Sequence, residues 1–103
     1  MFRLTPIQKA DLSAFCHRWK IAEFSFFGSF VRSDFHPGSD VDVLVTFTPD
    51  SDWSLWDHVS MEQELSQIMG RKVDLVTRDA VERSPNMIRR KAILESVQPY
   101  YVA

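Results

Sequence analysis

The 103-residue sequence has a single cysteine, Cys16, and no apolar run that approaches the roughly 20 residues of a membrane-spanning helix. One cysteine excludes an internal disulfide framework and a multi-cysteine zinc site. The first residues also lack the long apolar stretch of a signal peptide. These absences predict a protein of the reducing cytoplasm that does not enter a membrane.

An excess of positive charge is also missing. Twelve Lys and Arg residues face 14 Asp and Glu residues, for a formal net charge of -2. Proteins that coat nucleic acid usually carry a basic field, so we expect no direct nucleic-acid partner. There is no internal repeat, low-complexity segment or linker, and the length predicts one domain over residues 1–103. Because the sequence starts at Met1, we expect a whole small protein.

Hydrophobic patterning predicts alternating helices and strands. The expected elements are a helix over about 6–20, strands over about 22–27 and 40–47, a helix over about 54–69, a strand over about 72–77, a helical turn over about 78–83 and a last helix over about 85–97. Another helical turn is expected over about 29–33, and no element over the aromatic tail. This order indicates an α/β (α+β) domain with a small sheet flanked by helices, whose strand order stays open.

Local signals mark several helix ends. Thr5 and Gln8 have the spacing of a capping box, and either Ser54 or Asp52 can begin the next long helix. Gly70 is a natural C-terminal stop for that helix. The first helix is expected to bury a rough apolar stripe of Ile7, Leu12, Phe15, Cys16 and Trp19.

Asp40 and Asp42 stand two residues apart at the start of a predicted strand. Side chains on a strand alternate between faces, so both carboxylates point the same way, about 7 Å apart, while the valines between them face a core. Two carboxylates this close oppose each other's ionisation unless a cation neutralises them. Mg²⁺ is suited to this task, because one or two carboxylates and substrate phosphates commonly hold it.

Gly28 and Ser29 follow an apolar strand and precede a predicted helical turn. A glycine there exposes backbone N–H groups and lets a phosphate approach, and the Ser29 hydroxyl adds a donor. Asp74 interrupts the apolar strand and is the candidate third carboxylate, which can also draw a proton from a nucleophile. An anion cradle beside acidic metal ligands predicts a site for a magnesium nucleoside triphosphate and in-line phosphoryl displacement.

Each of these features also has a plain structural interpretation. Asp40 and Asp42 can be a solvated strand start, Gly28-Ser29 an ordinary turn, and Asp74 an edge-strand acid that faces water. Arg32 can bind phosphate or pair with a nearby acid to shape its loop. It is the combination of the motifs, in this order, that favours a site.

The combined pattern resembles the minimal nucleotidyltransferases of the DNA-polymerase-β-like superfamily. The residues that carry the resemblance are Gly28-Ser29-Phe30-Val31-Arg32, Ser39-Asp40-Val41-Asp42-Val43-Leu44-Val45, Lys72 to Val76, and Pro85 to Glu95. Family members often have glycine after the arginine, where this sequence has Ser33. The resemblance covers nearly the whole chain.

The resemblance implies the nucleotidyltransferase fold, a mixed sheet flanked by helices, and a set of functional residues. Asp40, Asp42 and Asp74 would be catalytic and would hold Mg²⁺, as two ions in the full arrangement. Gly28, Ser29, Arg32 and Ser39 would contact the nucleotide, with ATP as the substrate and pyrophosphate as the leaving group.

Stand-alone proteins of this kind resemble the antitoxin half of a bacterial toxin–antitoxin pair. The implied partner is an all-helical HEPN ribonuclease toxin, which the antitoxin would silence by adenylylating a tyrosine, in a hetero-oligomeric complex. The alternative is a non-catalytic antitoxin that occludes the toxin by binding alone. Transfer to a small molecule such as an aminoglycoside is disfavoured, because such enzymes usually carry an extra helical domain.

Three further groups of residues remain. Two of them have both a structural and a functional interpretation, and the third has only a structural one. Arg89-Arg90-Lys91 is a solvated helix face or a contact to the nucleotide or an acidic partner. Trp53, Trp56, Tyr100 and Tyr101 belong to the core or, where exposed, mark a partner surface. His17, His36 and His58 have no metal-binding spacing and are expected to be surface or packing residues.

Overall fold

The computed structural model describes residues 4–28 and 40–102. Its elements are α1 (Pro6–Arg18), β1 (Ile21–Phe27), β2 (Val41–Phe47), α2 (Leu55–Met69), β3 (Val73–Thr77), α3 (Arg78–Glu82), α4 (Met87–Ser96) and β4 (Gln98–Val102). The strands form one sheet in the order β3-β2-β1-β4, in which β1 is antiparallel to both of its neighbours and β2 is parallel to β3. The predicted α+β architecture with a mixed sheet is confirmed. Within these ranges, no helix has the length and apolarity to cross a membrane.

The helix ends follow the local chemistry of the sequence. The Thr5 hydroxyl accepts the Gln8 N–H at 3.1 Å, and the Gln8 side chain accepts the Thr5 N–H at 2.9 Å, so the capping box is confirmed. Ser54, and not Asp52, caps α2, and Gly70 ends that helix with a φ of +68°. The helix predicted over 6–20 was too long, because α1 ends at Arg18 and Trp19 caps it.

The structure also contains a strand that sequence analysis did not predict. β4 is a five-residue edge strand paired with β1, and Pro99 within it is compatible only with such an edge. The Tyr100 ring packs against Phe24 and Phe26, with centroids 6.2 and 5.7 Å away. Backbone pairing with β1 and the Tyr100 ring contacts therefore hold this segment at the edge of the sheet, although most of its side chains are exposed.

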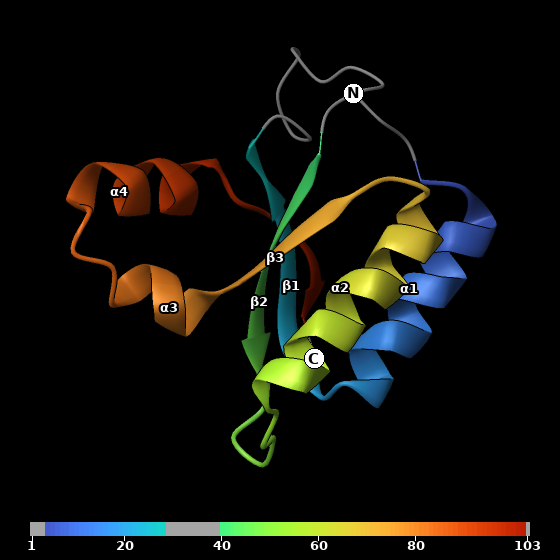
Figure 1. The fold of residues 1–103 in the computed structure, drawn as a ribbon. Coiled ribbons are helices and arrows are strands. Elements are labelled where there is room, and N and C mark those ends of the chain that lie inside the picture. The colour runs from blue at the N-terminus through green and yellow to red at the C-terminus, as the bar shows by residue number, and fades with distance from the viewer. Residues whose placement is uncertain (1–3, 29–39, 103) are drawn as a thin grey trace.

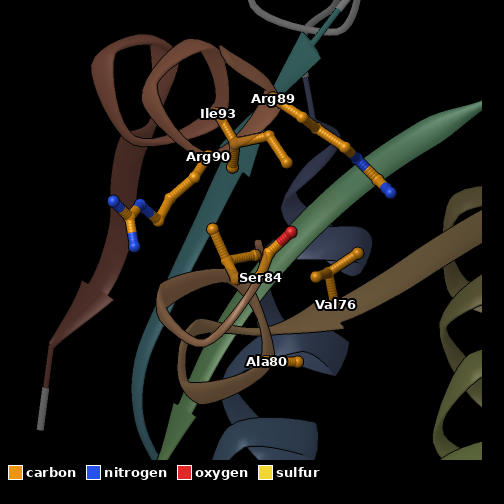
Figure 2. Close-up of a pocket in the computed structure, with 7 residues that line it drawn as sticks. Val76, Ala80, Ser84, Arg89, Arg90 and Ile93 are labelled. Carbon is orange, nitrogen blue, oxygen red and sulfur yellow. The ribbon is translucent and has the colours of Figure 1, made fainter. Parts of the chain in front are cut away.

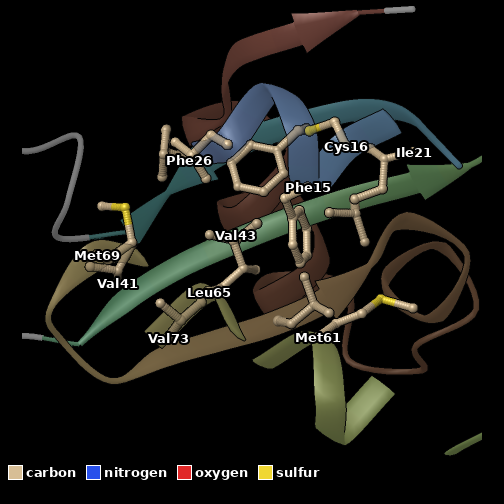
Figure 3. Close-up of a cluster of buried hydrophobic side chains, with 14 residues drawn as sticks. Phe15, Cys16, Ile21, Phe26, Val41, Val43, Met61, Leu65, Met69 and Val73 are labelled. Carbon is tan, nitrogen blue, oxygen red and sulfur yellow. The ribbon is translucent and has the colours of Figure 1, made fainter. Parts of the chain in front are cut away.

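The two faces of the sheet are covered by different helices (Figure 1). α1 and α2 lie on one face, and α3 and α4 on the other. The first face holds the main core, in which β2 contributes Val41, Val43 and Val45 with no exposed surface (Figure 3). We call it the closed face. Ile7, predicted on the buried stripe of α1, is instead 75% exposed.

The opposite face, which we call the open face, has a smaller apolar cluster. It comprises Phe27, Leu44, Val81 and Ile93, and partly buried Val76, Leu94 and Val97 pack against it. Its cover, the short helix α3 and the helix α4, comes from the C-terminal third of the chain. Polar side chains at the strand ends can therefore remain accessible on this face.

Candidate active site

Two of the predicted acidic residues lie side by side on neighbouring strands. Asp42 of β2 and Asp74 of β3 are register partners in the parallel pair. Neighbouring strands lie about 4.8 Å apart, and directly paired residues project from the same face. Val73 and Leu75, on either side of Asp74, are buried in the main core. Both carboxylates therefore project from the open face of the sheet.

Asp40 lies immediately before β2 and is exposed. It is two residues from Asp42, so it stands at the same end of the sheet as the Asp42–Asp74 pair. Among residues 4–28 and 40–102, no group of three or more His, Cys, Asp or Glu side chains has the closeness of a metal site. The convergence of Asp40, Asp42 and Asp74 on a metal thus remains a prediction.

Gly28 directly follows β1 and lies beside the Asp42 carboxylate. Its φ is +70°, a left-handed conformation that glycine adopts without strain. A Cβ placed on this residue would collide with Oδ2 of Asp42, whose register partner on β1 is Phe27. Glycine is needed here on two grounds, conformation and space. Its missing side chain leaves room beside the Asp42 carboxylate that any larger residue would fill.

The remaining predicted nucleotide contacts lie outside the described residues. These are Ser29, Arg32 and Ser39, together with the helical turn predicted over 29–33. Of the predicted site, the described residues therefore include Gly28, Asp40, Asp42 and Asp74. The candidate ligand atoms are carboxylate oxygens, the hard donors that Mg²⁺ prefers, so the chemistry of these side chains fits that ion.

β3, which carries Asp74, is an edge strand that α2 holds by side-chain hydrogen bonds. The Ser66 hydroxyl accepts the Val73 N–H at 3.1 Å, and the Glu62 carboxylate accepts the Leu75 N–H at 2.8 Å. These two amides flank Asp74 in the sequence. The α2 side chains thus satisfy the donors of an unpaired strand edge and fix the backbone on both sides of the acid.

His58 completes this hydrogen-bonded arrangement, which we call the α2–β3 clasp. Its Nε2 lies 3.0 Å from the Leu75 carbonyl oxygen and 3.9 Å from Oε2 of Glu62. Sequence analysis predicted only a surface or packing role for this histidine. The signal that could have found the clasp is its spacing, since residues 58, 62 and 66 share one face of a helix.

A small pocket opens on the open face, between α3, α4 and β3 (Figure 2). It has a volume of about 130 Å³ and is lined by Val76, Ala80, Val81, Ser84, Arg89, Arg90 and Ile93. Arg90 donates from Nη1 to the Glu82 carbonyl oxygen at 3.0 Å, which joins α4 to α3. Arg89 has no ion-pair partner within the described part of the chain, and the two arginines extend in opposite directions from α4. We call this cavity the α3–α4 pocket.

Comparisons with known proteins agree on one family. The nucleotidyltransferase domain family matches residues 12–98. A candidate protein adenylyltransferase of Methanocaldococcus jannaschii, MJ0128, is 32% identical over 80 residues, which cover 78% of this chain and 76% of that protein. The protein adenylyltransferase MntA of Thermococcus cleftensis is 35% identical over 65 residues, which cover 63% of this chain and 64% of that protein.

Solved structures share the fold. A candidate minimal nucleotidyltransferase is 29% identical, with a TM-score of 0.67 over 90% of this chain and 88% of that one. A toxin–antitoxin complex with AMP-PNP has a TM-score of 0.70 at 18% identity, over 92% of this chain and 73% of that one. A tri-AMPylated Shewanella oneidensis HEPN toxin in complex with an MNT antitoxin has a TM-score of 0.62 at 15% identity, over 93% and 71%. At these lower identities the likeness is one of fold.

Proposed function

The chain belongs to the nucleotidyltransferase domain family, as a minimal nucleotidyltransferase, and from this premise we propose that it is a Mg²⁺-dependent protein adenylyltransferase. In this proposal it acts in the cytoplasm as an antitoxin, by transferring AMP from ATP to a tyrosine of a cognate HEPN ribonuclease toxin. The observation that carries the proposal is the register pairing of Asp42 with Asp74, beside Gly28. Paired carboxylates repel each other and together suit a divalent cation, which a magnesium triphosphate supplies.

Each described residue of the site has its own proposed role in the reaction. Asp42 and Asp74, with Asp40, would hold Mg²⁺, which when bound neutralises phosphate charge and favours attack at the α-phosphorus. The backbone at Gly28 would receive the β- and γ-phosphates, which its left-handed turn and missing side chain allow. Ser29, Arg32 and Ser39 remain predicted contacts to the same nucleotide.

The transfer itself is a single displacement at phosphorus. The acceptor hydroxyl oxygen forms a bond to the α-phosphorus, the bond from that phosphorus to the α–β bridging oxygen breaks, and pyrophosphate leaves. Asp74, the accessible member of the carboxylate pair, would take the hydroxyl proton. Catalysis then consists mainly of positioning and charge stabilisation.

Relatives support both the reaction and the partner. Two curated relatives are named for protein adenylylation, and one fold neighbour is an MNT antitoxin bound to a tri-AMPylated HEPN toxin. Another neighbour is a toxin–antitoxin complex with an ATP analogue. In this chain the acceptor would accordingly be a residue of a toxin protein, within a hetero-oligomer.

Inhibition by binding alone is the second candidate function, and the surface of the chain favours it. Trp56 of α2 is 79% exposed beside the exposed Leu55, and Ile88 of α4 is 86% exposed beside the exposed Met87. Large apolar side chains in such positions are typical of partner surfaces. An antitoxin could use them to occlude a toxin without any transfer.

One experiment separates the two functions. The protein is incubated with ATP, Mg²⁺ and the toxin from the neighbouring gene, and the toxin's intact mass and ribonuclease activity are measured. We expect added AMP units and loss of ribonuclease activity with wild type, and neither with Asp42→Asn. Asp11→Asn, an exposed acid on α1, is the matched control and should behave as wild type. Full inhibition of the toxin by Asp42→Asn without a mass change would establish occlusion instead.

A further inference from the structure

The α3–α4 pocket lies on the same sheet face as the acidic pair, and the reaction described above does not use it. Its floor includes Val76, the second residue after Asp74 on β3. Residues two apart on a strand share a face and lie about 7 Å apart. The pocket is therefore one side-chain length from Asp74.

We propose that the α3–α4 pocket is the acceptor subsite, which holds the aromatic ring of the residue that receives AMP. This inference rests on the proposed function, in which Asp74 takes the proton of the acceptor hydroxyl. That hydroxyl must then lie beside Asp74, and the ring that bears it needs a place nearby on the same face. The pocket over Val76 is the described cavity that meets this condition.

The size of the pocket limits what can enter. Sites for whole drug-sized ligands have volumes of about 300–1,000 Å³, whereas this cavity has about 130 Å³. A complete nucleotide does not fit, but a single ring does. A phenol that enters from solvent can lie against the floor with its hydroxyl directed along β3 toward the acidic pair.

The chemistry of the lining suits such a ring. Val76, Val81 and Ile93 form an apolar floor, and they belong to or pack against the cluster on the open face. In Figure 2 the side chains of Ile93 and Val76 project into the space between α4 and β3. Burial of an aromatic ring against such side chains is favourable without any hydrogen bond.

The rim supplies the polar groups. Ser84 stands at the mouth, and its hydroxyl accepts the Asn86 N–H at 3.3 Å, which orders the turn between α3 and α4. Arg89 also lines the pocket, and its guanidinium has no ion-pair partner in the described ranges. A nearby cation favours the ionised form of a phenol and so assists transfer of its proton. These polar groups thus favour a ring that bears a hydroxyl over a purely apolar side chain as the occupant of the pocket.

Filling the pocket tests this assignment. Ala80 lines it from α3 and is exposed, so Ala80→Leu would occupy the cavity without disturbing the main core. Ala92→Leu makes the same change at an exposed position of α4 outside the pocket. We expect Ala80→Leu to raise the KM for the toxin acceptor about tenfold, as steric misfit in a side-chain pocket does, while Ala92→Leu leaves it unchanged.

Nucleotide binding is measured in parallel, with Mg²⁺ and α,β-methylene-ATP, which cannot transfer AMP. We expect the same affinity in wild type, Ala80→Leu and Ala92→Leu. An equal weakening of analogue binding in Ala80→Leu would assign the pocket to the nucleobase and overturn the proposal. An unchanged acceptor KM in Ala80→Leu would overturn it as well, while the proposed function would stand.

A final measurement does not depend on catalysis. N-acetyl-tyrosinamide is titrated into the protein and methyl resonances are followed by NMR, with N-acetyl-leucinamide as the non-aromatic control. We expect the tyrosine probe alone to shift the methyl signals of Val76 and Ile93, and Ala80→Leu to abolish the shift. If the chain transfers no AMP yet shows these shifts, the proposed function fails but the aromatic subsite stands. Absence of the shifts from wild type would overturn the subsite.

Discussion

The same strands present buried apolar side chains on the closed face of the sheet and acidic side chains on the open face. On β2, the side chains of Val41, Val43 and Val45 have no exposed surface, whereas Asp42 between them is only partly buried. The closed face is dry enough that burial raises the pKa of the Cys16 thiol to about 12. The open face carries the glycine, the acidic pair and the α3–α4 pocket.

This difference indicates where stability and chemistry reside. The closed face brings together side chains from α1, α2 and three strands, and it dominates the hydrophobic contribution to folding. The open face buries fewer apolar groups and carries acidic side chains that suit a divalent cation. Substitutions on the two faces should therefore separate activity from stability.

The largest effect on activity is expected on the open face, at Asp74. Asp74→Asn removes a negative charge but keeps the size of the side chain, so AMP transfer should fall at least about 10²- to 10³-fold. The melting temperature should stay within a degree or two of wild type, because the side chain is exposed. Steady-state rates and thermal unfolding measure both. Activity within tenfold of wild type would identify Asp74 as a solvated edge-strand acid.

The largest effect on stability is expected on the closed face, at Leu65. This α2 residue has no exposed surface, so Leu65→Ala should lower the free energy of unfolding by about 2–5 kcal/mol in urea denaturation. Leu55→Ala, on the same helix but 76% exposed, should change it by less than about 0.5 kcal/mol. Nucleotide affinity per folded molecule should be unchanged in both. A loss of affinity in Leu65→Ala would contradict the separation of the faces.

Two left-handed glycines among the described residues allow a finer comparison. Gly28 and Gly70 have φ values of +70° and +68°, so alanine at either should cost about 1–2 kcal/mol of stability through backbone strain. Only at Gly28 would the new Cβ meet the Asp42 carboxylate, since the space at Gly70 is open. We expect Gly28→Ala to lose binding of magnesium ATP in calorimetry and Gly70→Ala to keep it. Equal binding of magnesium ATP by the two variants would show that Gly28 is not part of the site.

Much of this arrangement could be predicted locally from the sequence. The alternation of Val and Asp along β2 assigned each residue to its face, and Thr5, Ser54 and Gly70 marked helix ends within a residue or two. These features depend on neighbours a few positions away. The acids themselves stood out because charges interrupt apolar runs.

The remainder depends on contacts between distant segments. The pairing of Asp42 with Asp74 follows from the strand order, which joins residues about 30 positions apart and which local patterns do not encode. β4 was missed because its stability comes from β1 and from the Tyr100 contacts. Periodicity likewise assigned Ile7 to a buried stripe and did not distinguish exposed Trp56 from a core aromatic. Tertiary packing determined those outcomes.

The smallest predicted effect concerns Glu62 of the α2–β3 clasp. Through this clasp α2, which covers the closed face, holds the edge strand that carries Asp74. Glu62→Ala leaves the Leu75 N–H to water, so this hydrogen bond's contribution of about 1 kcal/mol should be lost. Amide hydrogen exchange at Leu75 should then accelerate about fivefold, and kcat should fall several-fold as Asp74 loses its fixed backbone. Native-state exchange followed by NMR, with rates on the same samples, measures both.

The matched variants show whether Glu62 acts by positioning. Glu62→Gln keeps an oxygen acceptor for the Leu75 N–H and should retain slow exchange and most of the activity, whereas Gln63→Ala, exposed on the same helix, should change neither. A purely structural role would lower the melting temperature of Glu62→Ala while activity per folded molecule stayed at the wild-type level. Parallel recovery of exchange and kcat in Glu62→Gln would instead tie the strand edge to the carboxylate it carries, so that the closed side contributes to chemistry by holding Asp74 still.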